Sequence, residues 1–404
     1  MNFDKVKLGE LYTVHNGLSK GSKFFGSGYP FLSFSTVFNN YFIPEQLSDL
    51  VQSTEKEQSN YSIHRGDIFI TRTSETSDEL GMSCVALRDY PRATYNGFTK
   101  RMRPILADKV LPEYIGYYMR MPSFRGEFQA FSTMTTRASL KNEDLLSLVI
   151  ALPEMQIQKK ISAILRSYDL LIENNQKQIK LLEEAAQRLY KEWFVDLRFP
   201  DYETTPVVDG VPEGWTSCIL EDVICFNPKV ELTKNRIKQS VPMAALSASS
   251  MVLDKKEFTT AESNAGSKFQ NGDTLLARIT PCLENGKTAY VSNIDAEGAV
   301  GSTEFIVMRS ERLNPYMVYL LARTDDFRQT AINSMTGSDG RQRVQADKLK
   351  GYPYLLPTRE VMDTFKNIVE PIFEEISTKN EQIECLMQAR DRLLPKLMSG
   401  EIEV

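Results

Sequence analysis

The stretch Gln178-Ile-Lys-Leu-Leu-Glu-Glu-Ala-Ala-Gln-Arg-Leu189 occurs a second time, as Gln382-Ile-Glu-Cys-Leu-Met-Gln-Ala-Arg-Asp-Arg-Leu393. The numbers of matching positions differ by 204, and Gln, Ile, Leu, Ala, Arg and Leu recur in register. Each copy lies in a longer segment whose apolar residues are spaced by three and four. This spacing has a period near 3.5, which is typical of a coiled-coil seam. The sequence therefore predicts two related long helices.

Both predicted helices follow a Leu-Pro step, Leu152-Pro153 in one case and Leu356-Pro357 in the other. From Gln156 to Trp193 the first seam consists of Ile157, Ile161, Ile164, Tyr168, Leu171, Ile179, Leu182, Ala186, Leu189 and Trp193. The second consists of Val361, Phe365, Ile368, Ile372, Ile376, Ile383, Leu386 and Leu393. The chain order is globular domain, long helix, globular domain, long helix.

The globular domains are also related to each other. His64-Arg-Gly-Asp-Ile-Phe-Ile-Thr-Arg72 aligns with Gln270-Asn-Gly-Asp-Thr-Leu-Leu-Ala-Arg278, and the matching Gly, Asp and Arg differ by 206. The Gly-Asp pair fits a tight turn into a strand, after which the arginine emerges into a loop. The framework repeats but the loops do not. Since loops on a rigid framework usually carry function, the two domains are expected to recognise two different things.

We predict an α+β protein with two similar domains of mixed α/β structure and two long helices. The predicted segments are a first domain at 1–150, a spacer helix at 151–197, a linker rich in Pro and Gly at 198–212, a second domain at 213–355, and a second spacer helix with a tail at 356–404.

The two helices are expected to pair with each other as an intramolecular antiparallel coiled coil, because neither can bury its seam alone. The short linker favours antiparallel pairing, which predicts a pseudo-twofold molecule. Two departures stand out in the second helix. Pro395 predicts that the coil ends or kinks near Leu394, and Arg390 in place of Ala186 predicts looser pairing there.

Composition excludes several classes of protein. No apolar run approaches the roughly 18 residues of a membrane span, and the N-terminal residues lack an apolar signal region, so a cytoplasmic protein with no membrane contact is expected. Five cysteines without a Cys-x-x-Cys pair predict reduced thiols. Two histidines, His15 and His64, make a histidine metal site or catalytic triad improbable. The net charge of −5 argues against a uniformly basic nucleic-acid binder.

Catalytic motifs are absent from the sequence. There is no Pro-Pro step, hence no Asn/Asp-Pro-Pro-aromatic motif of amino-methyltransferases, and no Gly-x-Gly-x-x-Gly. Gly286-Lys287-Thr288 ends like a P-loop, but Pro281 occupies the position of its first glycine. The chain is therefore predicted to be a non-catalytic binding protein with no metal or cofactor of its own.

A pseudo-twofold molecule suits duplex DNA, whose adjacent half-sites have centres about 34–36 Å apart. Lysine, arginine, threonine and serine on predicted loops are candidates for contacting DNA, but any one of them alone is more typical of a solvated surface residue. The pairs Arg72/Arg278 and Arg137/Arg341 are stronger candidates, because they recur at matching positions in the two domains. The candidate DNA-binding residues of the first domain are Lys20, Lys23, Thr71, Arg72, Thr73, Lys100, Arg101, Arg103, Thr135, Thr136 and Arg137. Those of the second domain are Lys234, Arg236, Arg278, Thr280, Lys287, Ser338, Arg341 and Arg343.

Three stretches carry a family resemblance: Leu152-Pro-Glu-Met-Gln-Ile-Gln-Lys-Lys-Ile161, Val211-Pro-Glu-Gly-Trp215 and Arg392-Leu-Leu-Pro-Lys-Leu-Met-Ser-Gly-Glu-Ile402. The chain resembles the specificity (S) subunit of type I restriction-modification systems over its whole length. The resemblance implies two target-recognition domains that read the halves of a bipartite, asymmetric site in double-stranded DNA, with the helices setting the gap. It also implies two methyltransferase subunits and a restriction/translocase subunit as partners. S-adenosylmethionine, ATP and Mg would then belong to those partners.

Four aromatic residues at the end of the first helix, Tyr190, Trp193, Phe194 and Phe199, are candidates for partner docking. The alternative is that these rings pack against the globular domains. The alternative for the whole chain is a coiled-coil scaffold protein whose two domains bind proteins and not DNA.

Overall fold

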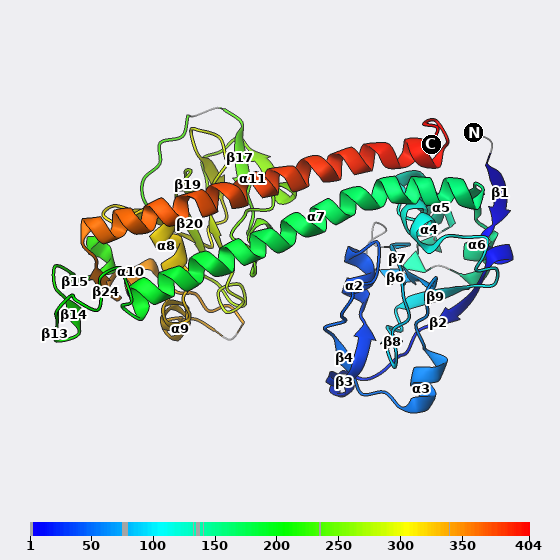
Figure 1. Cartoon of the computed structure of the whole chain (residues 1–404), viewed down its shortest axis with the longest axis horizontal. Coiled ribbons are helices and arrows are strands. Elements are labelled where there is room, and N and C mark those ends of the chain that lie inside the picture. Colours follow the sequence, from blue (N-terminus) through cyan, green and yellow to red (C-terminus); the bar gives the residue numbers. More distant parts are fainter. Residues whose placement is uncertain are drawn as a thin grey trace. The chain divides into compact units, whose positions relative to one another are not determined.

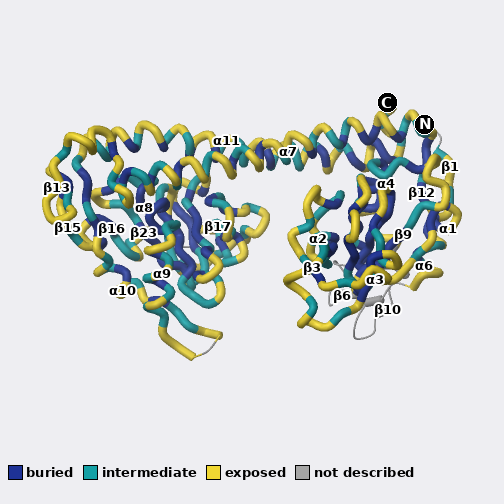
Figure 2. The backbone as a smooth tube through the Cα atoms, turned by 60° about the horizontal axis from the view of Figure 1, so that its bottom comes forward, coloured by how far each residue is buried: buried dark blue, intermediate teal, exposed yellow. Residues whose placement is uncertain are grey.

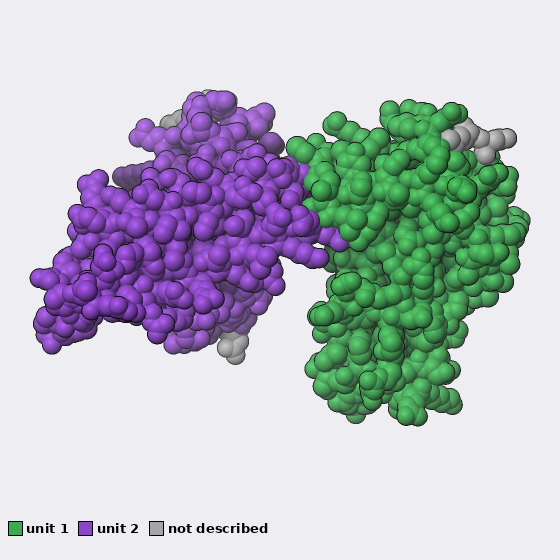
Figure 3. All heavy atoms as spheres, in the orientation of Figure 1, with its two compact units in different colours: residues 1–171, 385–404 green, residues 172–384 purple. Residues whose placement is uncertain are grey.

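The computed structural model describes residues 3–404 except 75–79, 132, 135–137, 140, 234–235 and 339. The chain divides into two compact units (Figure 3). Unit 1 comprises Met1–Leu171 and Cys385–Val404, and unit 2 comprises Ile172–Glu384. Two long helices, α7 (Met155–Tyr190) and α11 (Arg359–Met398), contribute residues to both units.

Unit 1 contains a four-stranded antiparallel sheet in the order β2-β9-β5-β7, with smaller sheets β4-β3-β8, β10-β11-β6 and β1-β12 (Figure 1). Its strands are β1 (Asp4–Lys7), β2 (Tyr12–Asn16), β3 (Phe25–Leu32), β4 (Leu50–Val51), β5 (Ile68–Thr71), β6 (Thr73–Ser74), β7 (Ser83–Val85), β8 (Thr94–Tyr95), β9 (Thr99–Pro104), β10 (Thr133–Met134), β11 (Ala138–Ser139) and β12 (Val149–Leu152). Its short helices are α1 (Leu8–Leu11), α2 (Phe34–Asn39), α3 (Glu55–Asn60), α4 (Pro112–Tyr118), α5 (Pro122–Phe131) and α6 (Asn142–Ser147).

Unit 2 contains the sheets β16-β23-β20-β21, β18-β17-β22-β19, β15-β24 and β13-β14. Its strands are β13 (Val207–Val208), β14 (Val211–Pro212), β15 (Thr216–Ile219), β16 (Ile224–Phe226), β17 (Lys238–Val241), β18 (Thr259–Ala261), β19 (Ser267–Phe269), β20 (Thr274–Ala277), β21 (Thr288–Tyr290), β22 (Ala299–Gly301), β23 (Phe305–Ser310) and β24 (Pro353–Leu356). Its short helices are α8 (Pro315–Ala322), α9 (Asp325–Asn333) and α10 (Ala346–Lys350).

The duplication predicted from the sequence is confirmed by the strand order. The sheet β2-β9-β5-β7 of unit 1 and the sheet β16-β23-β20-β21 of unit 2 are built in the same order along the chain. The pairs β1-β12 and β15-β24 also correspond, and each ends at the step into a long helix. Every residue of β5 and of β20 is buried, so these strands form the centre of each sheet.

The repeated Gly-Asp pair makes the turn into each central strand. Gly66 and Gly272 have φ of 88° and 91°, a conformation that glycine adopts without a Cβ clash. Asp67 accepts the backbone N–H of His64 at 2.8 Å and forms an ion pair with Arg103 Nη2 at 2.6 Å. Asp273 accepts the backbone N–H of Gln270 at 2.8 Å and forms an ion pair with Arg309 Nε at 2.7 Å. One buried carboxylate in each unit thus joins the turn to the neighbouring strand.

The long helices run antiparallel in each unit, as predicted. In unit 2 Asn175 of α7 donates to Gln382 of α11 at 3.2 Å, while further along α7 Tyr190 packs on Phe365 with ring centroids 6.1 Å apart. As residue numbers rise along α7 they therefore fall along α11. In unit 1 the core includes Ile161 and Leu165 of α7 together with buried residues of the end of α11 (Figure 2): Leu394, Leu397 and Met398.

Two expectations for the second helix are corrected. We expected the coil to end or kink near Leu394, and the expected end is wrong because α11 continues through Pro395 to Met398. Leu397 and Met398 are each 1% exposed in the core of unit 1, and this burial outweighs the hydrogen bond that proline cannot donate. We also expected looser pairing at Arg390. Its side chain is instead buried in an ion pair with Asp169 of α7, Nη1 to Oδ1 at 2.7 Å.

Candidate nucleic-acid interface

An arginine follows the central strand of each unit, as predicted. Arg72 comes directly after β5 and donates from Nη1 to Asn16 Oδ1 at 3.3 Å. Arg278 comes directly after β20 and donates from Nη2 to Gln345 Oε1 at 2.6 Å. In both side chains Nε is buried with no hydrogen-bond partner in the described part of the chain. Among the described residues each guanidinium is thus held by one amide side chain, and its Nη groups have further N–H donors suited to a guanine edge or a phosphate.

In unit 2 the turn that carries further predicted residues is bonded to the end of β20. Thr280 N–H donates to Gln342 O at 3.1 Å, and Val344 N–H donates to Arg278 O at 2.9 Å. The structure therefore brings together Arg278, Thr280, Ser338, Arg341 and Arg343, of which Ser338 and Arg341 are exposed. Arg343 is engaged with Glu304 at 2.8 Å, and these hydrogen bonds lower the pKa of that carboxyl group.

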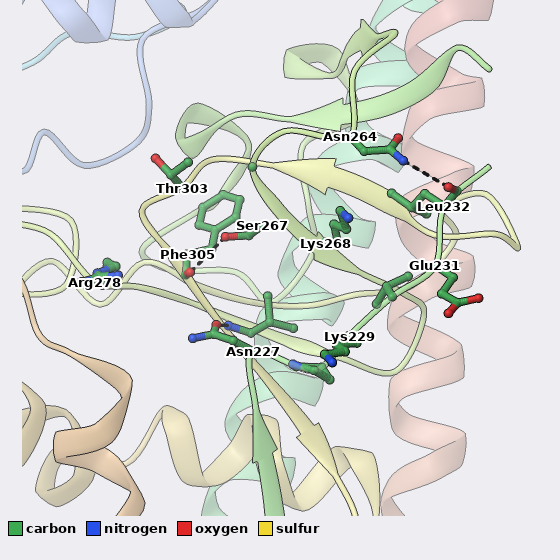
Figure 4. A pocket seen from close by; sticks show the side chains of 14 residues that line it. Asn227, Lys229, Glu231, Leu232, Asn264, Ser267, Lys268, Arg278, Thr303 and Phe305 are labelled. Carbon is green, nitrogen blue, oxygen red and sulfur yellow. Dashed lines mark hydrogen bonds between the residues drawn. The ribbon is translucent and has the colours of Figure 1, made fainter. Parts of the chain in front are cut away.

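A cleft of about 720 Å³ lies beside Arg278 (Figure 4). The loop after β16 supplies one wall, including Lys229, and β19 supplies Lys268. Asn264 on the rim donates from Nδ2 to Leu232 O at 3.1 Å, while its Oδ1 is buried with no partner in the described residues. Three cationic side chains around one hollow can contact phosphates and base edges together.

The remaining described candidates of unit 2 lie elsewhere. Lys287 Nζ donates to Met243 O at 3.1 Å, just before β21. Arg236 forms an ion pair with Glu297 at 2.5 Å and its side chain is 64% exposed. Lys234 lies outside the described residues.

In unit 1 the loop between β2 and β3 holds Lys20 and Lys23, whose Nζ atoms each lie 5.1 Å from the centroid of the Phe24 ring. Lys20 also forms an ion pair with Glu57 at 2.8 Å, and its hydrogen bond to that carboxylate lowers the pKa of Glu57. Lys23 is exposed. The hydroxyl of Thr71 is buried and accepts the N–H of Met82 at 2.9 Å. The loop thus presents one paired and one exposed cation.

Three predicted cations lie on β9 and are engaged within the unit. Lys100 is 5% exposed and donates to Asn142, and Arg101 is 8% exposed and donates to Ser62 O at 2.7 Å. Burial lowers the pKa of both side chains. Arg103 is the partner of Asp67 described above. The side chain of Thr73 and the residues Thr135, Thr136 and Arg137 lie outside what the structure describes.

Sequence reasoning missed the amides that hold the two arginines, Asn16 and Gln345, and the cleft residues Lys229, Lys268 and Asn264. One signal could have found the first cleft residue. Because β2 and β16 correspond, the loop that holds Lys20 corresponds to the loop that holds Lys229. No signal in the sequence distinguishes Lys268 or Asn264 from other surface residues.

The four aromatic candidates for docking lie in unit 2 at the end of α7 and after it. Tyr190, Trp193 and Phe199 are 1%, 8% and 4% exposed. Phe194 lies 4.8 Å from Phe365 between ring centroids, and Phe199 lies 4.8 Å from Trp215. These rings therefore pack mainly on each other, on Trp215 and on the start of α11.

An apolar groove of about 740 Å³ begins where this cluster reaches the surface. Tyr190 and Phe194 form part of its lining, together with Val195, which is 53% exposed. Tyr352 and Tyr354 line it from β24 and the residue before it. Charged side chains stand among the lining residues: Glu184, Arg188, Lys191, Arg323, Asp325 and Asp326.

A family model described as the type I restriction modification DNA specificity domain matches residues 1–184. The match covers the first 184 residues, and the whole chain is similar to type I restriction enzyme specificity subunits. The repeated sheet and the antiparallel helices agree with that similarity. The comparisons do not favour a coiled-coil scaffold of another class.

Among the relatives, the type I restriction enzyme MjaIX specificity subunit of Methanocaldococcus jannaschii is 25% identical over 434 residues, covering 100% of this chain and 94% of the relative. The EcoEI specificity subunit of Escherichia coli is 31% identical over 168 residues, covering 39% of this chain and 28% of the relative. A crystal structure of the type I S subunit from M. genitalium shares the fold, with a TM-score of 0.55 at 12% identity, and covers 98% of this chain and 96% of that chain.

Within the described residues, no helix is long and apolar enough to cross a membrane. The same residues contain no group of three or more His, Cys, Asp or Glu side chains arranged to hold a metal ion.

Proposed function

We propose that this chain is the DNA sequence-recognition subunit of a type I restriction-modification complex, and that each domain reads one half of a bipartite, asymmetric target. The observation that carries the proposal is the repeated arginine, Arg72 after β5 and Arg278 after β20. Arginine is the side chain that most often reads guanine in the major groove. Because the same strand end is surrounded by different loops in the two units, the two half-sites should differ in sequence.

Within the second recognition domain, we assign different tasks to the cations of the cleft. Lys229 and Lys268 would hold backbone phosphates, which set the position of the duplex but carry no sequence information. Arg278 would donate to a base edge from its terminal Nη groups, because its position is fixed by Gln345. The exposed Arg341 on the neighbouring turn would add a further contact.

The experiment that tests this function is selection of bound sequences from duplexes with randomised positions, using the chain reconstituted with its methyltransferase subunits. We expect two fixed blocks separated by an unread gap. Arg278→Ala should relax one block only, whereas Arg312→Ala, which removes an exposed arginine after β23, should leave both blocks intact. A single block, or binding without sequence preference, would contradict the proposal.

The paired helices α7 and α11 would set the length of the gap. Seven residues inserted into each helix add about 10 Å of rise, which corresponds to about three base pairs of duplex DNA. The gap should lengthen by that amount while the two blocks stay unchanged. A change in the block sequences would argue against the helices as a spacer.

We further propose that the partners are two methyltransferase subunits and a restriction/translocase subunit. This chain would bring no catalytic site, cofactor or metal, and S-adenosylmethionine, ATP and Mg would be bound by the partners. The net charge of −5 supports a division of labour in which the methyltransferases supply much of the non-specific affinity for DNA. The chain alone should bind duplex weakly, and tight, strongly salt-dependent binding by the isolated chain would contradict this.

The apolar groove at Tyr190 and Phe194 is our candidate seat for a methyltransferase subunit. Val195→Asp places a charge on an exposed residue of the groove without disturbing the buried rings. Leu181→Asp is the matched control, because Leu181 is 63% exposed on α7 and does not line the groove. We expect Val195→Asp to reduce co-purification of the methyltransferase and Leu181→Asp to leave it unchanged. Equal behaviour of the two variants would exclude the groove as the seat.

A further inference from the structure

A buried ion pair occupies the contact between α7 and α11 in unit 1. Asp169 and Arg390 are each 7% exposed, and Nη1 of the arginine lies 2.7 Å from Oδ1 of the aspartate. The hydroxyl of Tyr117 donates to the other carboxylate oxygen. The remaining N–H groups of Arg390 reach Asp391 at 3.0 and 2.9 Å, and its guanidinium lies 4.8 Å from the Tyr41 ring centroid. Both charges are therefore compensated.

The same positions are apolar in unit 2. The shift of 204 that relates α7 to α11 places Arg390 on Ala186 and Asp169 on Phe373, which are 1% and 4% exposed. Tyr319 takes the place of Tyr117, and its ring packs on Phe373 with centroids 5.9 Å apart. A charged pair with a tyrosine hydrogen bond in unit 1 thus corresponds to a phenylalanine, an alanine and a tyrosine in unit 2.

This difference decides which helices can pair. If α7 paired with α7 of a second copy in the same register, Asp169 would meet Ala186 of that copy and lose its counter-ion. If α11 paired with α11, Arg390 would meet Phe373 of the second copy. In each case a charge would be buried without a partner, which is strongly unfavourable. Only the combination of α7 with α11 satisfies both residues.

We propose that the Asp169–Arg390 pair is a pairing code, which selects α11 as the partner of α7 and prevents homotypic coils between copies of the chain. The code is needed because the two helices resemble each other elsewhere along their seams, with six of the twelve residues of 178–189 identical to those of 382–393. It is also needed because α7 is synthesised before α11. Until α11 has been synthesised, the available helix that most resembles it is the α7 helix of a neighbouring nascent chain. This inference does not depend on the proposed DNA-binding function.

The test installs the apolar pair of unit 2 in unit 1. Asp169→Phe with Arg390→Ala makes both homotypic coils match the Phe373–Ala186 pattern. The full-length chain also carries Asn175→Cys and Gln178→Cys, and its five native cysteines are replaced by serine so that no other thiol can cross-link two chains: Cys84, Cys218, Cys225, Cys282 and Cys385. By the shift of 204, Gln178 takes the place of Gln382, which contacts Asn175, so the two introduced cysteines join two chains only in an α7–α7 coil. The chain is refolded from denaturant at high concentration, and covalent dimer is measured on a non-reducing gel.

We expect little covalent dimer with the native pair and a shift of about a hundredfold toward homotypic pairing in the variant. The exchanged pair Asp169→Arg with Arg390→Asp should stay at the native level, because it keeps complementary charges. Should the apolar variant fail to fold, Asp169→Asn with Arg390→Gln removes both charges at nearly constant size and should also raise the yield of dimer. Equal dimer yields in the native and uncharged proteins, or high yield in the native protein, would overturn the proposal.

Discussion

In unit 1 the loop after β2 places Lys20 against Glu57, 2.8 Å away, whereas in unit 2 the loop after β16 opens into a cleft at Lys229. The strands behind these loops are the same in both units, and each contains the same buried carboxylate, Asp67 or Asp273. These strands must keep their core packing, so few substitutions are tolerated in them. The loops contribute few core residues, so their sequences can diverge. Two duplicated domains can therefore share one architecture and read unlike sequences.

The largest effect should come from exchanging a whole domain. Replacing residues 1–150 with the corresponding domain of a relative should change one block of the DNA target and leave the other and the gap unchanged. Affinity for the original site should fall about a thousandfold or more, since half of the specific contacts are lost. Binding selection on the reconstituted complex measures this. A change in both blocks would show that the two domains do not read independently.

The next largest effect should come from neutralising the buried carboxylate that both units share. Asp67→Asn and Asp273→Asn each leave a partly buried arginine without its counter-ion, and each should destabilise its own unit by about 3 kcal/mol. The loss should be somewhat larger for Asp273→Asn, because the side chain of Arg309 is 23% exposed and that of Arg103 is 32% exposed. Hydrogen–deuterium exchange of β5 and of β20 reports the two units separately. Faster exchange in both units from one substitution would contradict independent frames.

The elements that sequence reasoning predicted well are those fixed by local spacing. The period of the helix seams and the repeated Gly-Asp turns depend on residues close together in the chain, so the two long helices, their antiparallel pairing and the position of Arg72 and Arg278 could be predicted. Strands β5 and β20 also follow from short apolar runs that begin at a glycine turn.

Partners distant in sequence account for what could not be predicted. Arg390 was expected to loosen the coil because its counter-ion, Asp169, lies 221 residues away. Pro395 was expected to interrupt the coil because the residues that bury the end of α11 lie far from it in the sequence, in the segment Met1–Leu171. Lys100 and Arg101 resemble an exposed basic cluster, yet β9 lies between β2 and β5, and their acceptors come from Asn142 and Ser62.

Smaller effects on DNA binding are expected from replacing the arginine that follows the central strand of each unit. Arg72→Ala and Arg278→Ala should each weaken binding to the complete target by about 2 kcal/mol and relax only their own half-site. The fold of each unit should remain intact, because among the described residues each arginine side chain makes one side-chain hydrogen bond, to Asn16 or Gln345. Competition between duplexes mutated in one block or the other measures this. Uniform weakening across sequences would reassign the arginine to a phosphate.

The smallest effect concerns the hydrogen bonds by which the globular part of each unit is attached to the long helices. In unit 2 Glu183 of α7 accepts Met251 N–H at 2.7 Å and the Ser250 hydroxyl at 3.1 Å, whereas the matching residue of α11 in unit 1 is Met387. Burial raises the pKa of Glu183 above its usual value, with the two hydrogen bonds opposing the shift. The folded state therefore binds this proton more tightly than the unfolded state. The corresponding stability is present at low pH and is lost as pH rises through the raised pKa.

Glu183→Gln removes that loss, because the amide oxygen can still accept the Met251 N–H while carrying no charge. Unit 2 of the variant should be slightly more stable than the native unit at neutral pH, and this advantage should vanish on acidification. Unit 1 should not respond. Glu184→Gln is the control for removing a carboxylate from the same turn of α7, since Glu184 is 60% exposed in its ion pair with Lys180. Urea unfolding followed by hydrogen exchange in each unit measures the difference. An advantage that persisted at low pH would mean that packing, and not the buried charge, distinguishes the attachment of unit 2.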